Sequence, residues 1–194
     1  MKLPPETVIV ALGSNLGDSA RQVLEGVRAL QNLSILPVRC SSLWQTAPVD
    51  CPPGSPLFVN AVVALWPAAG ETPASFLEKT QRIEREFGRV PKRVLNEPRP
   101  LDLDLIAFGR VEMRTPTLVL PHPRAAERRF VLEPLAELDR DFVIPGKVVT
   151  VAAILAGLRV SGDAGAGEGK ITAATQHRPT GRRGDHERGE MTSS

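Results

Sequence analysis

The chain has 194 residues, of which 42% are hydrophobic, and a formal net charge of only +2. This length and composition allow one globular core, and so small a net charge does not favour a general nucleic-acid-binding surface. The two cysteines, Cys40 and Cys51, match neither a disulfide scaffold nor a zinc site, and no stretch resembles a secretion signal or a membrane span. These features predict a reduced, cytoplasmic protein.

The N-terminal part predicts a strand, a loop and a helix. Residues 7–12 form a short apolar run typical of a central strand, and apolar residues recur at helical spacing from 19 to 30. Residues 13–18, between them, are rich in turn formers. Because they match neither the Walker A pattern nor Gly-x-Gly-x-x-Gly, a structural turn is favoured over a phosphate-binding loop.

The next segment predicts two strands around a proline-rich loop. Residues 35–44 alternate loosely and residues 58–65 are almost entirely apolar, so both are predicted as strands. Residues 45–56 are too rich in proline for regular structure, which favours a lid or a binding loop. Asn60 lies inside the apolar strand, and its amide needs partners from either the protein or a ligand.

A second helix is predicted over residues 73–87, followed by a charged loop at 89–98 and a strand that ends at Gly109. The order is therefore strand, helix, strand, strand, helix, strand. This order predicts an α+β, ferredoxin-like (split βαβ) sandwich, in which a mainly antiparallel sheet carries helices on one face.

The remainder of the chain divides into ordered elements and a tail. A short strand is predicted at residues 117–123, and the apolar segments 131–138 and 149–158 are predicted to cover the core as helices. Beyond residue 160 large apolar side chains are almost absent, so little can be buried to offset the entropy of ordering. The prediction is a domain at residues 1–160 and a disordered, low-complexity tail at 161–194.

Two aspartates stand at alternate positions of the strand near the middle of the chain. Leu101, Leu103 and Leu105 fall on one face, which places Asp102 and Asp104 on the other, with about 6.6 Å between their Cα atoms. Two such carboxylates suit Mg²⁺, which prefers oxygen ligands and shares them with phosphates. A half-exposed strand with solvated aspartates is the alternative interpretation.

Basic residues gather close to these aspartates in the sequence. They are Lys79, Arg82, Arg85, Arg89, Lys92, Arg93 and Arg99. Because cationic side chains bind phosphate oxygens while carboxylates bind the metal, this chemistry favours a magnesium–nucleotide ligand. His122, next to a further basic cluster, is either a packed imidazole or a hydrogen-bond donor to phosphate.

Four motifs carry a resemblance to a known family. They are ALGSNLGD at residues 11–18, FVNA at 58–61, RPLDLD at 99–104, and LPHP at 120–123 with RRFVL at 128–132. In this order they resemble the 6-hydroxymethyl-7,8-dihydropterin pyrophosphokinases of folate biosynthesis, over about residues 7–158. The resemblance implies a ferredoxin-like fold and transfer of pyrophosphate from ATP to the pterin hydroxymethyl group, with release of AMP.

The resemblance also implies roles for individual residues. Asp102 and Asp104 match the ligands of two Mg²⁺ ions, and Arg89 and Arg99 are predicted to be catalytic with them. The positions that match ATP contacts are Gln81, Glu84, Arg89, Arg99, His122 and Arg128. The positions that match the pterin pocket are Thr46, Val49, Phe58, Asn60 and Phe130. Two aromatic rings in this set, at 58 and 130, are suited to stack on the two faces of the pterin.

The reaction predicted on this basis is in-line attack of the substrate hydroxyl on the β-phosphorus of ATP. Arg89, Arg99 and Arg128, with the metals, would stabilise the charge that develops as AMP leaves. The sequence shows no obvious general base. Asp104 is a candidate, although a carboxylate bound to a metal is a weak base.

Three segments are predicted to act as lids that exclude water: 13–18, 47–57 and 89–98. The chain departs from the family pattern in the last of these. Asn96 stands where a Trp is common, and Pro91 stands in place of a second Arg. Phe58 stands where a Tyr occurs, which keeps the ring and loses a hydroxyl.

Two other functions compete with this interpretation. A non-catalytic RNA-binding ferredoxin-like module would need aromatic residues in a recognisable motif on the sheet, but the chain has 4% aromatic residues and no Tyr. Another Mg²⁺-dependent nucleotidyl or glycosyl transferase with an Asp-x-Asp motif would typically use a larger α/β sheet. The predicted partners are therefore a pterin and ATP, with no nucleic acid and no membrane, and the chain is predicted to be a monomer.

Overall fold

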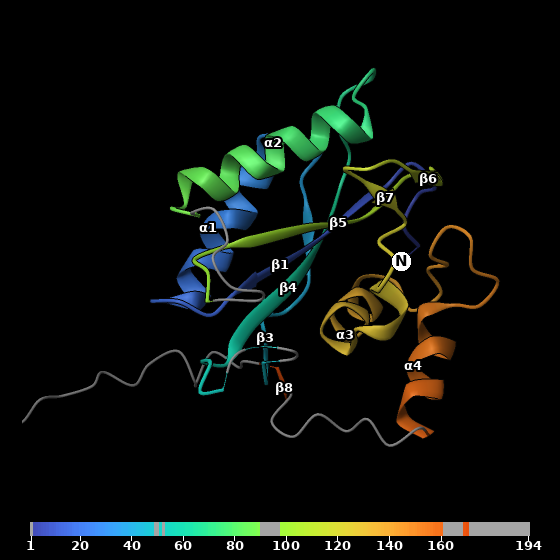
Figure 1. Cartoon of the computed structure of the whole chain (residues 1–194). Helices are drawn as coiled ribbons and strands as arrows, with labels where there is room; N and C mark the ends of the chain where they lie inside the picture. The colour runs from blue at the N-terminus through green and yellow to red at the C-terminus, as the bar shows by residue number, and fades with distance from the viewer. Residues whose placement is uncertain (1, 49–50, 52, 90–97, 161–168, 171–194) are drawn as a thin grey trace, which may run out of the picture.

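The structure is a computed structural model that describes residues 2–48, 51, 53–89, 98–160 and 169–170 (Figure 1). The strands are β1 (Val8–Ser14), β2 (Arg39–Cys40), β3 (Trp44–Thr46), β4 (Phe58–Leu65), β5 (Asp102–Phe108), β6 (Met113–Arg114), β7 (Val119–Leu120) and β8 (Gly169–Lys170). The helices are α1 (Ser19–Gln31), α2 (Pro73–Glu86), α3 (Arg129–Leu138) and α4 (Val151–Val160), with a short 3₁₀ helix, η1 (Ala125–Glu127). No helix in these ranges has the length and apolar character to cross a membrane.

One antiparallel sheet forms the centre of the fold. Its strands run in the order β5-β1-β4-β3-β8, and β2 also pairs with β4. α1 follows the central strand β1, and α2 connects the central strand β4 to the edge strand β5. The predicted α+β class and the ferredoxin-like order of strands and helices are thus confirmed.

The strand predicted at residues 35–44 is instead two short strands, β2 and β3, each paired with β4. Ser41 lies at the interruption, where its N–H donates to the Val62 carbonyl at 2.9 Å. The Ser41 hydroxyl accepts the Val62 N–H at 3.0 Å, so a side-chain oxygen takes the place of a backbone carbonyl in the ladder. The next residue, Ser42, donates its N–H to Glu137 of α3 at 2.8 Å.

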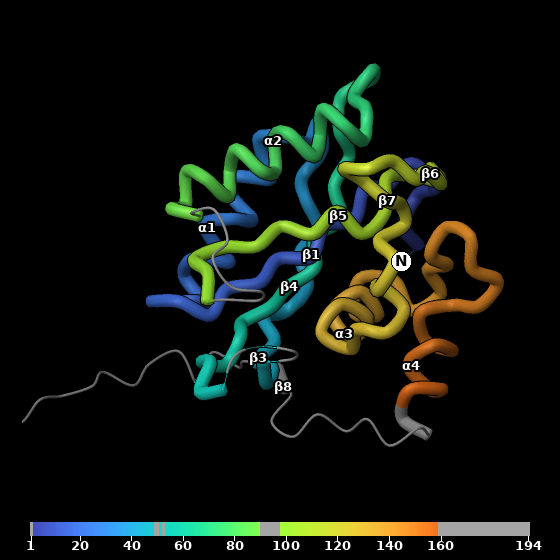
Figure 2. The backbone as a smooth tube through the Cα atoms, in the orientation of Figure 1, coloured from blue at the N-terminus to red at the C-terminus, as the bar shows by residue number. Residues whose placement is uncertain are grey.

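Helices cover both faces of the sheet, whereas the sequence predicted them on one face. α1 and α2 pack on the face that carries Val8, Val10 and Leu12, while α3 and α4 pack on the face that carries Ile9 and Ala11 (Figures 1 and 2). Every residue of β1 is buried. A strand that is apolar on both sides must be covered on both sides, so the second pair of helices is needed.

The position of α1 is fixed at its start and at its middle. The Asp18 carboxylate accepts the Arg21 N–H at 3.1 Å, so Asp18 caps the helix. A Cβ at Gly26 would lie 3.0 Å from Leu101 and 3.2 Å from Leu12. The missing side chain therefore lets α1 lie close against the sheet.

Two predicted segments near the C-terminus are shorter than expected or only partly described. The strand predicted at residues 117–123 is reduced to β7, which pairs with β6 in a separate two-stranded sheet and precedes a cis Leu120–Pro121 bond. Within 161–194, predicted as a disordered tail, Gly169–Lys170 forms β8 beside β3. The other residues of that tail lie outside the described part of the chain.

Candidate active site

β5 directs its two aspartates away from the core, as predicted. Leu101, Leu103 and Leu105 are buried against the α1 and α2 side. Asp102 and Asp104 alternate with them, and their side chains are 23% and 34% exposed. Both carboxylates therefore stand on the opposite face, on a strand at the edge of the sheet.

The neighbouring strand β1 presents small residues beside these carboxylates. Gly13 is the register partner of Asp102, and Ala11 is the partner of Asp104. Gly13 also pairs with Asn60 of β4, and a Cβ at Gly13 would lie 3.0 Å from the Asn60 Oδ1 atom. Gly13 was predicted as part of a loop, but it belongs to β1, where its lack of a side chain leaves room over the sheet.

Asn60 joins two parts of the predicted pterin pocket. Its Nδ2 donates to the Thr46 Oγ1 atom of β3 at 2.8 Å. Asn60 is only 4% exposed, yet it lines a pocket together with Thr46 and Phe58. The two interpretations of Asn60 are therefore compatible, because its amide nitrogen has a protein partner while the residue still borders the pocket.

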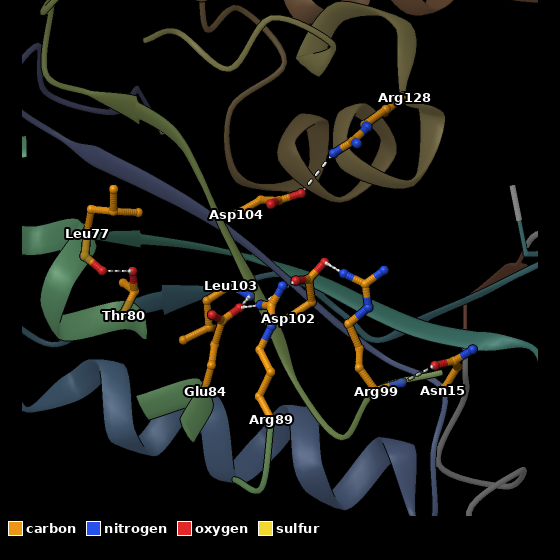
Figure 3. Close-up of polar contacts among 10 residues, drawn as sticks. All are labelled: Asn15, Leu77, Thr80, Glu84, Arg89, Arg99, Asp102, Leu103, Asp104 and Arg128. Carbon is orange, nitrogen blue, oxygen red and sulfur yellow. Dashed lines mark hydrogen bonds and ion pairs between the residues drawn. The ribbon is translucent and has the colours of Figure 1, made fainter. Parts of the chain in front are cut away.

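Three arginines neutralise the two aspartates (Figure 3). Arg89 Nη1 lies 2.8 Å from Asp102 Oδ1, and Arg99 Nη1 lies 2.9 Å from Asp102 Oδ2. Arg128 Nη1, beside the start of α3, lies 2.8 Å from Asp104 Oδ2. All three guanidinium groups are at least partly buried, so their charges are screened less than those of surface pairs.

A third carboxylate, Glu84 of α2, adjoins the first aspartate. Its Oε1 atom accepts the Leu103 backbone N–H at 2.8 Å and is also bonded to Arg89 (Figure 3). The Glu84 side chain is 7% exposed. Burial raises the pKa of Glu84 to about 7, and the negative charges of the neighbouring aspartates contribute to this rise. The Leu103 hydrogen bond and the positive charge of Arg89 act in the opposite direction and lower this pKa.

His122 reaches the same region from the segment after β7. The backbone N–H of His122 donates to the Ile106 carbonyl of β5 at 2.9 Å. Its ring Nδ1 atom accepts the backbone N–H of Arg124 at 3.2 Å. Burial lowers the pKa of His122, which favours a neutral ring with the proton on Nε2. Such a ring can donate one hydrogen bond to an anion.

These groups surround a pocket of about 390 Å³. It is lined by every predicted site residue within the described ranges: Thr46, Phe58, Asn60, Gln81, Glu84, Arg89, Arg99, Asp102, Asp104, His122, Arg128 and Phe130. The Arg128 guanidinium also lies 5.4 Å from the centre of the Phe130 ring, so a cation–π contact joins the basic and aromatic sides of the pocket. The predicted pterin contact Val49 lies outside the described residues.

Sequence reasoning missed some of the lining. Arg124 and Leu77 also border the pocket and were not predicted, whereas Ala47 and Cys51 border it from the segment predicted as a lid. The basic run after His122 is a signal that could have indicated Arg124. The two positions where the chain departs from the family loop, 91 and 96, lie outside the described part of the chain.

One predicted lid is tied to the strand that carries the aspartates. The Asn15 N–H donates to the Arg99 carbonyl at 3.3 Å, and the Arg99 N–H donates to Asn15 Oδ1 at 3.0 Å. The loop after β1 is therefore joined to the segment that enters β5. The other predicted lids include residues 49–50, 52 and 90–97, which are not described.

Comparison with known proteins decides the family. A family model described as 7,8-dihydro-6-hydroxymethylpterin-pyrophosphokinase (HPPK) matches residues 9–140. The chain belongs to this family. The predicted resemblance to this family is confirmed.

Curated HPPK relatives cover most of the chain. The 2-amino-4-hydroxy-6-hydroxymethyldihydropteridine pyrophosphokinase of Bacillus subtilis is 39% identical over 66% of this chain and 75% of its own length. The enzyme of the same name from Haemophilus influenzae is 35% identical over 74% of this chain and 88% of its own length. The folic acid synthesis protein fol1 of Pneumocystis carinii is 35% identical over 76% of this chain, but the chain spans only 19% of that protein's length.

Solved structures agree on the fold. The crystal structure of Plasmodium falciparum HPPK-DHPS, wild type with pteroate, has a TM-score of 0.65 to this chain at 13% identity. The match covers 85% of this chain and 45% of that one. At this identity the likeness supports the HPPK fold alone.

Proposed function

We propose that this HPPK-family chain transfers pyrophosphate from ATP to the hydroxymethyl group of 6-hydroxymethyl-7,8-dihydropterin and releases AMP. The observation that carries the proposal is the meeting of two carboxylates and three arginines in one pocket that also has aromatic walls. Carboxylates suit a divalent cation and guanidinium groups suit phosphate oxygens. The relatives named for this reaction support the choice of substrates.

Asp102 and Asp104 are suited to hold two Mg²⁺ ions. Both are partly exposed and side by side, and they offer only oxygen ligands. No three His, Cys, Asp or Glu side chains in the described ranges gather to hold a metal by themselves. The aspartates would therefore share the ions with the phosphates of ATP, and the ions would compensate the phosphate charge.

Arg89, Arg99 and Arg128 would bind phosphate oxygens when the nucleotide is present. Without a nucleotide, these arginines balance the charges of Asp102, Asp104 and Glu84. A nucleoside triphosphate with two divalent cations is close to neutral, so its binding leaves this balance intact. The arginines can then exchange carboxylate partners for phosphate partners without any charge becoming unpaired.

The remaining nucleotide contacts would come from α2 and from the segment after β7. Gln81 and Glu84 line the pocket from the helix, and His122 can donate its Nε2 proton to a phosphate oxygen. These residues, with the three arginines, form the proposed ATP site.

The pterin would lie at the other side of the pocket. Phe58 and Phe130 supply aromatic surface, and the joined pair of Asn60 and Thr46 supplies polar groups for the ring's amide-like edge. Val49 is included in this site on the strength of the family resemblance alone.

The chemistry proposed is in-line attack of the pterin hydroxyl oxygen on the β-phosphorus of ATP, with AMP as leaving group. The three guanidinium groups would stabilise the charge that develops on the phosphates. Asp104 is the proposed acceptor of the hydroxyl proton. For this role Arg128, which pairs with that carboxylate, would have to exchange it for a phosphate oxygen.

The test is a coupled assay that measures AMP when ATP, Mg²⁺ and hydroxymethyldihydropterin are supplied together. AMP formation that depends on all three supports the proposal. Formation of ADP, or release of AMP without the pterin, would point to another phosphoryl or nucleotidyl transferase.

We also propose that the chain acts as a cytoplasmic monomer. The chain has only two cysteines, which is too few for a disulfide scaffold, and this supports a reducing compartment. Size-exclusion chromatography with light scattering tests the oligomeric state, and fractionation of the source cells tests the location.

A further inference from the structure

We propose that Glu84 is a positioning residue of the HPPK site, which clamps the open edge of β5 between the two aspartates and fixes Arg89 beside the first of them. This inference rests on the proposed function. It assigns Glu84 a task within the protein itself, in addition to any contact with the nucleotide.

Glu84 contacts β5 at Leu103, the residue between Asp102 and Asp104. β5 lies at the edge of the sheet and pairs only with β1 in the described sheet. Leu103 donates its N–H to Glu84 Oε1 at 2.8 Å, from a buried position. The bond satisfies a backbone donor that would otherwise be left without a partner at an open edge, and it holds the peptide that sets the spacing of Asp102 and Asp104.

The same oxygen holds Arg89. Glu84 Oε1 is bonded to Arg89 Nη1, and that nitrogen also lies 2.8 Å from Asp102 Oδ1. Gly88, with a φ of +88°, ends the helix and turns the chain, and the Arg89 N–H donates to the Glu84 carbonyl at 3.0 Å. Both the backbone and the side chain of Arg89 are thus anchored to Glu84.

An ionised carboxylate buried at position 84 destabilises the fold unless a positive charge pairs with it. Glu84 is 5% exposed, and burying a charge costs free energy that a neutral side chain would avoid. Glutamine could accept the Leu103 N–H equally well, since its amide also carries an oxygen acceptor. An ionised carboxylate holds the Arg89 guanidinium more strongly than a neutral amide would, so the charge serves Arg89 and the oxygen serves β5.

The two tasks are separated by two substitutions. Glu84→Gln keeps an acceptor for Leu103 and removes the charge that holds Arg89, whereas Glu84→Leu removes both. Glu78→Gln, which changes an exposed carboxylate of the same helix, is the matched control. Each variant is assayed for kcat, for the KM of ATP and for the exchange rate of the Leu103 amide proton by NMR.

We expect Glu84→Gln to lower kcat about tenfold while the KM of ATP changes by less than about threefold. In an Arg89→Met background the same change should lower kcat by less than about twofold, because the partner it positions is already absent. Leu103 amide exchange should be unchanged in Glu84→Gln and faster in Glu84→Leu. The control should match the wild type throughout.

Several outcomes would overturn the inference. A large rise in the KM of ATP with unchanged kcat in Glu84→Gln would make Glu84 a simple ligand contact. Full additivity with Arg89→Met, or slow Leu103 exchange in Glu84→Leu, would remove the anchoring of Arg89 or the clamp on β5. If the wild type forms no AMP, the proposed function fails, while the exchange measurement still decides whether the clamp exists.

Discussion

The two faces of the central sheet use the same strands in different ways. On the α1 and α2 face, Val8, Val10 and Leu12 of β1 are all apolar and buried. On the other face the side chains diminish along the strand, from Ile9 in the core to Ala11 and then to no side chain at Gly13. Next to the small residues stand Asp102, Asp104 and Asn60.

The difference shows where a site can form on a two-sided sheet. Strand alternation sends every second residue to each face, so one face can remain a dry core while the other changes character along its length. α3 and α4 cover the apolar part of the second face. The pocket occupies the part where small residues leave space and where carboxylates, arginines and aromatic rings converge.

The largest effect is expected from the polar part of the second face. Replacing Asp102 or Asp104 by Asn keeps the size of the side chain and removes the charge needed for the proposed Mg²⁺ ions. We expect kcat to fall by at least about a thousandfold in the AMP assay, which corresponds to about 4 kcal/mol of lost transition-state stabilisation.

The control for this prediction is Asp141→Asn, an exposed carboxylate away from the pocket. It should keep full activity. Circular dichroism should show that all three variants remain folded, because neither aspartate is part of the apolar core. An Asp102→Asn variant with normal turnover would remove the two-carboxylate site from the mechanism.

The next effect concerns the pH dependence of stability in the protein without ligands. Burial raises the pKa of Glu84 from 4.5 to about 7, so between these values the folded state binds more protons than the unfolded state. The free energy of unfolding should therefore fall as pH rises from about 4.5 to about 7 and then stay level. This contribution is at most about 3 kcal/mol.

Glu84→Gln isolates that contribution. Urea denaturation at pH 5 and pH 8 measures the free energy of unfolding of both proteins, and the titrating groups distant from Glu84 contribute alike to each. The wild type should lose more stability between the two pH values than the variant does. Equal losses would show that the Glu84 carboxyl titrates at its ordinary pKa.

A smaller effect is expected on the apolar face. In Gly26→Ala the new Cβ would lie 3.0 Å from Leu101 and 3.2 Å from Leu12, so the packed leucine side chains or α1 must shift by a few tenths of an ångström. We expect a loss of about 2 kcal/mol in the free energy of unfolding by urea denaturation. The KM of the pterin should not change, because the residues of the proposed pterin site lie on the other face or on β3. A changed KM of the pterin at unchanged stability would contradict this division.

The sequence predicted the parts of the fold that depend on local pattern. Alternation of Leu and Asp placed Asp102 and Asp104 together on one face, and the apolar spacing predicted α1 and α2 to within a few residues. The family resemblance then brought residues from distant segments into one site, and every one of them that is described lines the pocket.

What the pattern could not predict depends on contacts between distant residues. The break between β2 and β3 arises because the Ser41 hydroxyl pairs with Val62 across the sheet. The placement of helices on both faces is different, because the run of apolar residues on both sides of β1 was a signal for it that the prediction did not use. The pairing of Glu84 with Leu103 joins a helix to a strand nineteen residues further along the chain, with no local signal.

The smallest effect is expected at Gly13, the counterpart of Gly26 on the face that carries the site. In Gly13→Ala the new Cβ would lie 3.0 Å from Asn60 Oδ1 and 3.8 Å from Phe58, so Asn60 must shift while Thr46 holds its amide nitrogen. We expect the KM of the pterin to rise about tenfold, with little change in the KM of ATP and less than about 1 kcal/mol lost in stability. Gly26→Ala should instead lose stability and leave the KM of the pterin unchanged. If both glycine variants lost stability equally and bound the pterin normally, the two faces of the sheet would not be functionally distinct.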